Sequence, residues 1–206
     1  QKKQDAQLQV WTSYQESLKQ AKAWLDSMEN GAKTDQVNWL SLQETRSRLL
    51  KHKTTLQDIA SHRRFIESVN EKGAAVVQAN PHAAADEIQA DIESINDRYE
   101  ELLEGMKKTI AVMEEAIDCI QQYQELQKTH QEWQKQMWDK LSMYTDYSGS
   151  KSSLAARLDK VNELENSLSE GEGVLKTLMG HVATMDEEKL PTRAREAMDR
   201  DLANIK

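Results

Sequence analysis

The chain has 206 residues, of which 7 are Gly and 2 are Pro, and a net charge of -8 from 27 basic and 35 acidic side chains. This negative balance disfavours general binding to nucleic acid and direct contact with anionic membranes. The single cysteine excludes an internal disulfide, and no run reaches the roughly 18 apolar residues of a membrane span. With 38% hydrophobic and 30% charged residues, the composition is typical of helices that each bury one apolar stripe.

The breaker residues of the first half predict three helices. The first helix is expected over about residues 6–29, with the Asn-Gly pair at residues 30–31 as its end. The second is expected over about residues 36–78, and the Asn-Pro pair at residues 80–81 supplies a cap and a first-turn proline for the third. Apolar residues of the second helix recur at coiled-coil spacing, and these are Leu42, Leu49, Leu56, Ile59 and Ile66.

The third helix is predicted to continue without a break into the next part of the chain. Its apolar stripe begins at Ile88 and Ile92 and keeps steps of three and four as far as Tyr144, with no proline and one glycine, Gly105. Roughly 57 residues at 1.5 Å per residue would form a helix about 85 Å long. Beyond it, a Ser-Gly-Ser turn at residues 148–150 precedes another helix, and Leu-Pro-Thr at residues 190–192 opens the last one.

The second half of the chain repeats the first. Trp24 recurs as Trp133, an offset of 109 residues, and several apolar positions keep this offset. The matching pairs include Tyr14 with Tyr123, Met28 with Met137, Leu49 with Leu158, Ile59 with Leu168, and Val69 with Leu178. We therefore expect two domains, residues 1–115 and residues 116–206.

Each repeated unit is predicted to be a bundle. A helix with a single apolar stripe is unstable alone in water, whereas three such helices can share one core. The sequence therefore predicts an all-α fold of tandem three-helix antiparallel coiled-coil bundles, joined by a continuous helix. Among the stripe positions, we expect Leu49, Ile59 and Ile92 to lie in the first core.

Three features of the chain occur together in a known family. They are the tryptophans Trp24 and Trp133 on the first helix of each unit, the stretch Arg-Tyr-Glu-Glu-Leu at residues 98–102, and the uninterrupted join. Over essentially the whole chain, these features resemble the spectrin-repeat family. The resemblance implies that both tryptophans pack in the centre of a bundle. The family usually has a second tryptophan where this chain has Tyr99, so we expect a slightly less filled core there.

The resemblance also suggests a parent protein. The degenerate repeats, with Trp-Leu-Ser-Leu at residues 39–42, look most like those of the giant nesprins, which link the outer nuclear membrane to the cytoskeleton. Plakins, dystrophin-type proteins and spectrin itself are the alternatives. The nesprin resemblance implies a cytoplasmic, cytoskeleton-associated segment whose parent lies at the outer nuclear membrane. Actin, or an actin regulator such as a formin, is then the expected partner.

The titratable residues do not suggest catalysis. His52 and His130 fall on or beside helix seams, and the other three histidines have no partners at metal-ligand spacing. The chain has neither a glycine-rich phosphate loop nor a nucleophile elbow. We therefore expect no enzyme activity, no metal site and no cofactor.

Charge is distributed unevenly between the second and third helices. Residues 46–64 carry six basic side chains against one acid, whereas residues 86–104 carry eight acids against one arginine. One interpretation is that these helices neutralise each other across the bundle. The other is that outward basic side chains bind an acidic partner such as actin or a regulatory protein. The candidate residues for such binding are Arg48, Lys51, Arg63 and Arg64.

Two features of the second unit are candidates for association. Trp138 has no counterpart in the repeat, and a half-exposed tryptophan near methionines can mark a protein interface, although packing in the loop is the alternative. The chain ends before the position equivalent to Tyr99, so the last helix of this unit is expected to be truncated at about half its length. The resulting groove predicts either lower stability or self-association through the second repeat.

Two functions are compatible with these predictions. In the first, the chain is a structural spacer and protein-docking segment of a cytoskeletal linker protein, connecting the nuclear envelope to actin. In the second, it is a specific binding module for a cytoskeletal regulator such as a formin.

Overall fold

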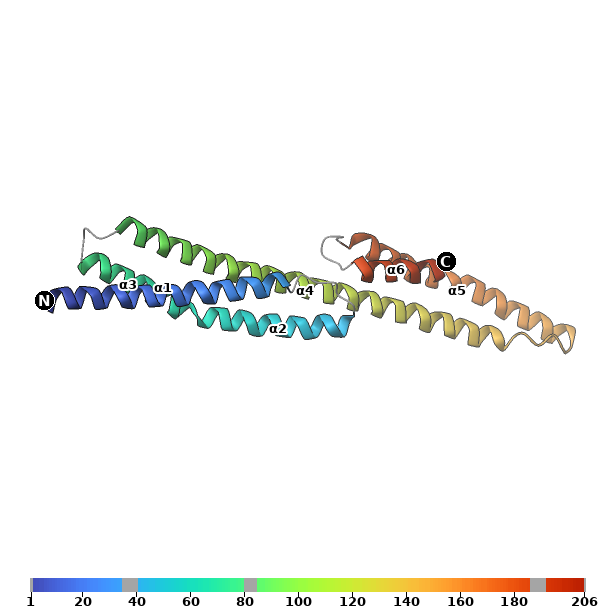
Figure 1. Ribbon diagram of the computed structural model, residues 1–206. Helices are drawn as coiled ribbons and strands as arrows, with labels where there is room; N and C mark the ends of the chain where they lie inside the picture. The colour runs from blue at the N-terminus through green and yellow to red at the C-terminus, as the bar shows by residue number, and fades with distance from the viewer. Residues whose placement is uncertain (1, 35–40, 80–84, 186–191, 206) are drawn as a thin grey trace. The chain divides into compact units, whose positions relative to one another are not determined.

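A computed structural model describes residues 2–34, 41–79, 85–185 and 192–205 (Figure 1). These residues form six α-helices and no strand, which confirms the predicted all-α fold. The helices are α1 (Lys2–Thr34), α2 (Leu42–Ser61), α3 (Arg63–Ala79), α4 (Ala85–Ser142), α5 (Lys151–Thr184) and α6 (Thr192–Ile205).

The chain divides into two compact units. The first comprises Gln1–Asn38 and Gln43–Met113, and the second comprises Trp39–Leu42 and Glu114–Lys206. Helix α4 therefore contributes residues to both units. Its 58 residues confirm the predicted uninterrupted helix, which ends at Ser142 rather than at Tyr144.

Helix α1 continues through the Asn-Gly pair at residues 30–31, so the predicted end at this pair is wrong. Among the described glycines, Gly149 alone has a positive φ, so Gly31 does not adopt the left-handed conformation of a helix-ending glycine. A glycine inside a helix costs about 1 kcal/mol relative to alanine, which is too little to end a helix of 33 residues.

The predicted second helix is interrupted at His62, so the prediction of one continuous helix is wrong there. The Ser61 hydroxyl donates to the Asp58 carbonyl at 2.7 Å, and His62 Nδ1 lies 2.9 Å from the same oxygen. These side chains compete with the backbone for this carbonyl, and the His62 N–H is shared between the carbonyls of Asp58 and Ile59. Helix α3 then begins at Arg63.

The turn between α4 and α5 lies where the sequence predicted it. Gly149 has φ 124°, a conformation that favours glycine. Ser150 then caps α5, because its hydroxyl accepts a hydrogen bond from the Ser153 N–H at 3.3 Å. The predicted proline boundaries at residues 80–81 and 190–191 lie outside the described residues. Helix α6 begins at Thr192, the last residue of the stretch that was predicted to open it.

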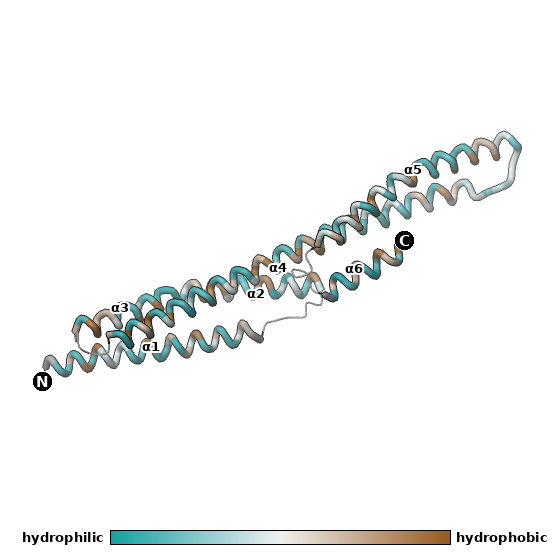
Figure 2. The backbone as a smooth tube through the Cα atoms, turned by 90° about the horizontal axis from the view of Figure 1, so that it is seen from above, coloured by the Kyte–Doolittle hydropathy of each residue, from teal (hydrophilic) through white to brown (hydrophobic). Residues whose placement is uncertain are grey.

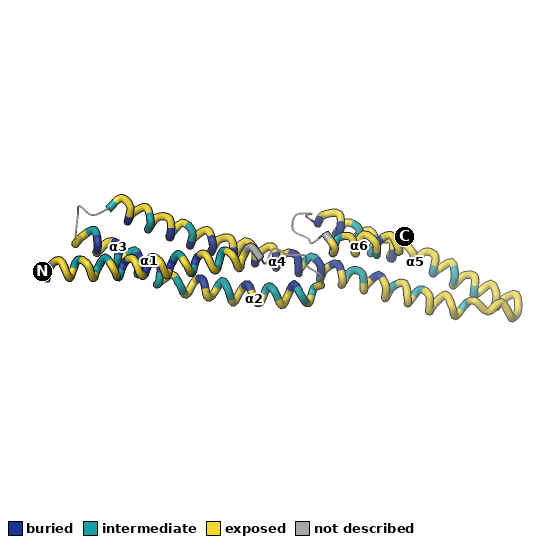
Figure 3. Tube along the Cα trace, in the orientation of Figure 1, coloured by how far each residue is buried: buried dark blue, intermediate teal, exposed yellow. Residues whose placement is uncertain are grey.

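The core of the first unit lies between α1, the α2–α3 pair and the first half of α4. Figure 3 shows its buried residues on the inward faces of these helices, and Figure 2 shows the hydrophobic stripes along them. Tyr14 is central to this core, and burial, aided by the charge of Asp91, raises its pKa to about 12. The most deeply buried members are Tyr14, Ala21, Leu25, Ile59, Ile66, Val69, Ile88 and Ile95.

The second unit has a smaller core, where α6 packs with α4 and α5. Tyr123 is buried here, and its hydroxyl donates to the Met198 carbonyl at 3.4 Å. Burial, followed by the charge of Asp201, raises the Tyr123 pKa to about 12. Toward the turn that joins them, α4 and α5 become largely exposed (Figure 3). The buried members of this core are Ile120, Tyr123, Leu178, Val182, Met185, Met198 and Leu202.

Gly171 on α5 lies against the Trp133 ring of α4 in the second unit. It is buried, and a Cβ at this position would overlap the Trp133 ring. A Cβ at Gly173, two residues along the same helix, would meet no atom within 4 Å. The two glycines therefore separate the effect of crowding from that of helix propensity.

We expect Gly171→Ala to destabilise the second unit by about 1–3 kcal/mol, because the Trp133 ring has to move. Gly173→Ala is the control and should stabilise α5 by up to about 1 kcal/mol through helix propensity alone. Urea unfolding followed by circular dichroism measures both changes. Equal stabilisation by the two substitutions would contradict the close contact.

His130 is a buried titratable group of the second unit. Its side chain is 3% exposed, its ring lies 5.9 Å from that of Trp133, and its Nδ1 has no hydrogen-bond partner. Burial disfavours the charged form and lowers the His130 pKa below its ordinary value of 6.5. The unfolded chain therefore binds this proton more tightly than the folded chain does.

We expect neutral His130 to contribute fully to the folding stability when the pH lies above the pKa of this histidine in the unfolded chain. This contribution should be lost as the pH falls through about 6.5. The melting temperature of the second unit should accordingly fall between about pH 7.5 and pH 5.5. In His130→Leu this part of the pH dependence should disappear, and thermal unfolding at both pH values measures it. A pH dependence that is the same in both proteins would show that His130 does not cause it.

Candidate protein-docking surfaces

The predicted core residues of the first unit lie in or against its core. Ile59 is fully buried, and Tyr99, which is 3% exposed, donates a hydrogen bond from its hydroxyl to the Ile59 carbonyl at 3.2 Å. Burial is the main cause of the raised pKa of Tyr99. Leu49 and Ile92 are partly buried and pack against the same cluster. This hydrogen bond ties α4 to the end of α2.

Trp24 lies at the edge of the first core, whereas Trp133 lies outside the buried cluster of the second unit. Trp24 is partly buried, whereas the next residue, Leu25, is fully buried. The Trp24 ring stacks on that of His62 with centroids 4.5 Å apart, and lies 6.4 Å from the Tyr99 ring. Trp133 is also partly buried and lies against Gly171. The central position that the resemblance implied for them is therefore only partly reached.

The basic candidates lie on α2 and α3, on either side of the interruption at His62. Lys51, Arg63 and Arg64 are exposed. Arg48 is partly buried and pairs with Glu44 at 3.0 Å, while Arg63 Nε lies 3.3 Å from a Glu67 carboxylate oxygen. We call Lys51, Arg63 and Arg64 the basic surface. Arg48 is not included, because it is partly buried and paired with Glu44.

The acidic stretch of α4 forms ion pairs with α1. Lys22 Nζ lies 2.7 Å from an Asp91 carboxylate oxygen. Arg98, within the same stretch, binds both Glu29 oxygens, at 2.8 and 3.0 Å, and Asp26 at 2.6 Å. The hydrogen bonds to Glu29 and then to Asp26 raise the Arg98 pKa. These contacts join α1 and α4. The neutralisation hypothesis had instead paired the acidic stretch with the basic second predicted helix.

Trp138 lies on the part of α4 that belongs to the second unit, and it is 71% exposed. Met143 and Tyr147, which follow it toward the turn, are 72% and 85% exposed. These values leave Trp138 more exposed than expected and do not support the alternative of packing in the loop. Because the basic surface belongs to the first unit, the two predicted binding features are separate.

A groove predicted for the second unit is present, although the sequence did not identify the residues that line it. It has a volume of about 260 Å³ and lies between the turn-proximal parts of α4 and α5. The repeat places Leu168 at the position equivalent to Ile59, but it does not show that Ile59 is buried and Leu168 is 46% exposed. The residues that line the apolar groove are Met137, Leu141, Val161, Leu164, Glu165 and Leu168.

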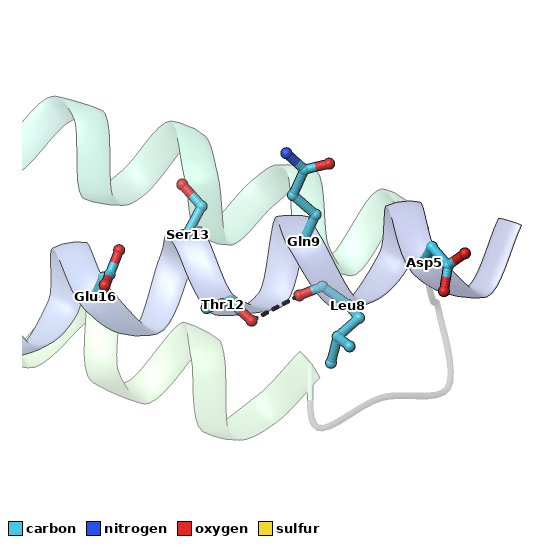
Figure 4. A pocket seen from close by; sticks show the side chains of 6 residues that line it. All are labelled: Asp5, Leu8, Gln9, Thr12, Ser13 and Glu16. Carbon is cyan, nitrogen blue, oxygen red and sulfur yellow. Dashed lines mark hydrogen bonds between the residues drawn. The ribbon is translucent and has the colours of Figure 1, made fainter. Parts of the chain in front are cut away.

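The other notable depression is a shallow one on α1 (Figure 4). Its lining residues all come from successive turns of one helix, and the Thr12 hydroxyl donates a hydrogen bond to the Leu8 carbonyl at 2.9 Å. Side chains from a single helix do not converge on a substrate. Across the described ranges, no three His, Cys, Asp or Glu side chains are placed to hold a metal ion. No described helix is long and apolar enough to cross a membrane.

Comparison with known proteins agrees with this architecture. The spectrin repeat family matches residues 9–115, more than half of the chain. The chain is also 43% identical over 205 residues to Muscle-specific protein 300 kDa of Drosophila melanogaster. That alignment covers 99% of the chain but 2% of the Drosophila protein. No solved structure matches the chain. With its helical bundle packing and its matching sequence, the chain belongs to the spectrin repeat family of structural proteins.

Proposed function

We propose that the chain is a structural spacer and protein-docking segment of a cytoskeletal linker protein. The observation that carries this proposal is the continuity of α4, which runs for 58 residues and contributes to both compact units. A continuous helix transmits tension between neighbouring bundles through its backbone hydrogen bonds, with no intervening loop to extend. Catalysis has no part in this proposal.

Contacts within the first unit support a role in transmitting tension. The Arg98 guanidinium is held by Asp26 and Glu29, and Lys22 binds Asp91, so α1 and α4 are linked at two levels. The Tyr99 hydroxyl links α4 to α2 through Ile59. Partly buried, multidentate arginine pairs hold their geometry better than single exposed pairs.

The parent protein is proposed to be nesprin-like, with this segment in the cytoplasm between the nuclear envelope and actin. The similarity to a very much longer Drosophila protein supports a giant parent. The Trp-Leu-Ser-Leu sequence at residues 39–42 supports the nesprin resemblance. A repeat pair from a spectrin, plakin or dystrophin-type protein is the alternative parent.

The basic surface is the proposed docking site of an acidic partner, either actin or an actin regulator such as a formin. Lys51, Arg63 and Arg64 are exposed in a chain whose net charge is negative, so basic side chains are accessible to an acidic partner there. Electrostatic complementarity of this kind determines the partner and the association rate more than the total affinity. If this site is the main role of the chain, it is a specific binding module rather than a spacer.

We expect Val112→Pro to uncouple the two units. Val112 is 37% exposed and adjoins Met113, where the first unit ends, so the main effect is loss of a helix hydrogen bond at a cost of about 3 kcal/mol. In single-molecule stretching, the variant should unfold at lower force and in two separate events. Val112→Ala is the control, and identical force curves for the two variants would contradict the spacer proposal.

We expect Arg63→Glu combined with Arg64→Glu to weaken partner binding by about tenfold or more, because like charges then face each other. Co-sedimentation with filamentous actin and capture by a purified formin measure the change. Lys19→Glu with Lys108→Glu alters the net charge equally at exposed positions on other helices. If both double variants bind as the unchanged chain does, the basic surface is not a docking site.

A further inference from the structure

The interruption between α2 and α3 removes a backbone hydrogen bond at one identifiable carbonyl. In a continuous helix the Ile59 carbonyl would accept from the Arg63 N–H, four residues further along. In the described helices it accepts instead from the His62 N–H at 3.1 Å and from the Tyr99 hydroxyl at 3.2 Å. The missing backbone bond is therefore the one whose acceptor Tyr99 occupies.

The local side chains and Tyr99 act on different carbonyls. The Ser61 hydroxyl donates to the Asp58 carbonyl at 2.7 Å, and His62 Nδ1 lies 2.9 Å from the same oxygen. This carbonyl nevertheless keeps its helical partner, the His62 N–H, at 3.2 Å. A side chain that enters the ladder of helix hydrogen bonds is a cause of local bending. At the next carbonyl, that of Ile59, Tyr99 of α4 is such a side chain.

The interrupted conformation satisfies both donors that compete for the Ile59 carbonyl. Tyr99 is 3% exposed, so its hydroxyl is shielded from water and would lose free energy if it were left unpaired. Arg63 is exposed, so water can accept a hydrogen bond from its backbone N–H. The helix thus gives up a bond that water replaces, while the buried hydroxyl gains one that water could not supply.

A continuous helix would be compatible with the same core. Buried residues recur at seven-residue steps from α2 into α3, so α3 continues the face that α2 buries. The residues at these steps are Thr45, His52, Ile59, Ile66 and Gly73. What separates the two helices is therefore confined to the backbone near residue 62.

We propose that Tyr99 controls the conformation of the basic surface from α4. While its hydroxyl binds the Ile59 carbonyl, α2 and α3 stay separate; without the hydroxyl, the Arg63 N–H takes this carbonyl and the two helices become continuous. Lys51 precedes the interruption, whereas Arg63 and Arg64 follow it. The relative placement of these side chains thus depends on which conformation is present. The inference rests on the proposed docking role of the basic surface.

This contact makes α4 the regulator of a surface that lies on other helices. Helix α4 contributes to both units, and a displacement that draws the Tyr99 hydroxyl away from Ile59 frees the carbonyl as removal of the hydroxyl does. Trp24 of α1 lies at the same place, because its ring stacks on that of His62 with centroids 4.5 Å apart and lies 6.4 Å from the Tyr99 ring. Tension along α4 would in this way change the surface on α2 and α3.

Amide hydrogen exchange of the whole chain tests the control of the helix. In Tyr99→Phe we expect the Arg63 amide to exchange at least about tenfold more slowly than in the unchanged chain, since it gains a backbone bond. If Tyr99 only stabilised the bundle, its loss would instead speed exchange along α2 and α3. Tyr123→Phe is the control, because it removes a similar hydroxyl bond, to the Met198 carbonyl, in the second unit. Circular dichroism establishes that both variants keep their helices.

Co-sedimentation of the same proteins with filamentous actin, and capture by a purified formin, test the effect on docking. We expect Tyr99→Phe to weaken binding by about threefold or more, and Tyr123→Phe to leave it unchanged. Slower exchange at Arg63 without binding by any of the proteins would support control of the helix by Tyr99 and contradict only the docking proposal.

Three results would overturn the inference. The first is an Arg63 amide that is as protected in the unchanged chain as that of Ile66, which bonds to the His62 carbonyl at 3.2 Å. The second is a folded Tyr99→Phe chain whose Arg63 amide exchanges as fast as before, or faster. The third is a Tyr99→Phe chain that shows slower exchange at Arg63 and yet binds its partner as the unchanged chain does.

Discussion

The apolar stripe of α4 extends along 58 residues, and its burial is the constraint on which both units depend. A long helix with one apolar side gains most of its stability from the helices that cover that side. In the first unit the cover comes from α1 and the α2–α3 pair, and in the second from α5 and α6. Because one helix supplies part of each core, changes in either core act on the same backbone.

The interactions around Tyr99 show how this burial is made specific in the first unit. The Tyr99 hydroxyl uses a backbone carbonyl at the end of α2, where His62 interrupts the helix and stacks on Trp24. Arg98, the preceding residue, holds two acids of α1. Apolar packing alone would allow the helices to slide by a turn, whereas these directional contacts favour one alignment.

The two units carry the same pattern but differ in how completely it is covered. Leu25 and Ile59 are fully buried in the first unit, while Leu158 and Leu168 of the second are largely open to solvent. The proposed docking site is the basic surface of α2 and α3, which would act through charge.

The sequence by itself determined the helical class, the repeat and the continuity of α4, because three-four spacing and the absence of proline act along a single helix. It could not place the interruption at His62, which depends on side chains competing for one carbonyl and on a ring stacked from α1. It also could not show that Arg48 is partly buried or that Leu168 is exposed. Burial depends on which other helix covers a residue, and that was decided only by the tertiary structure.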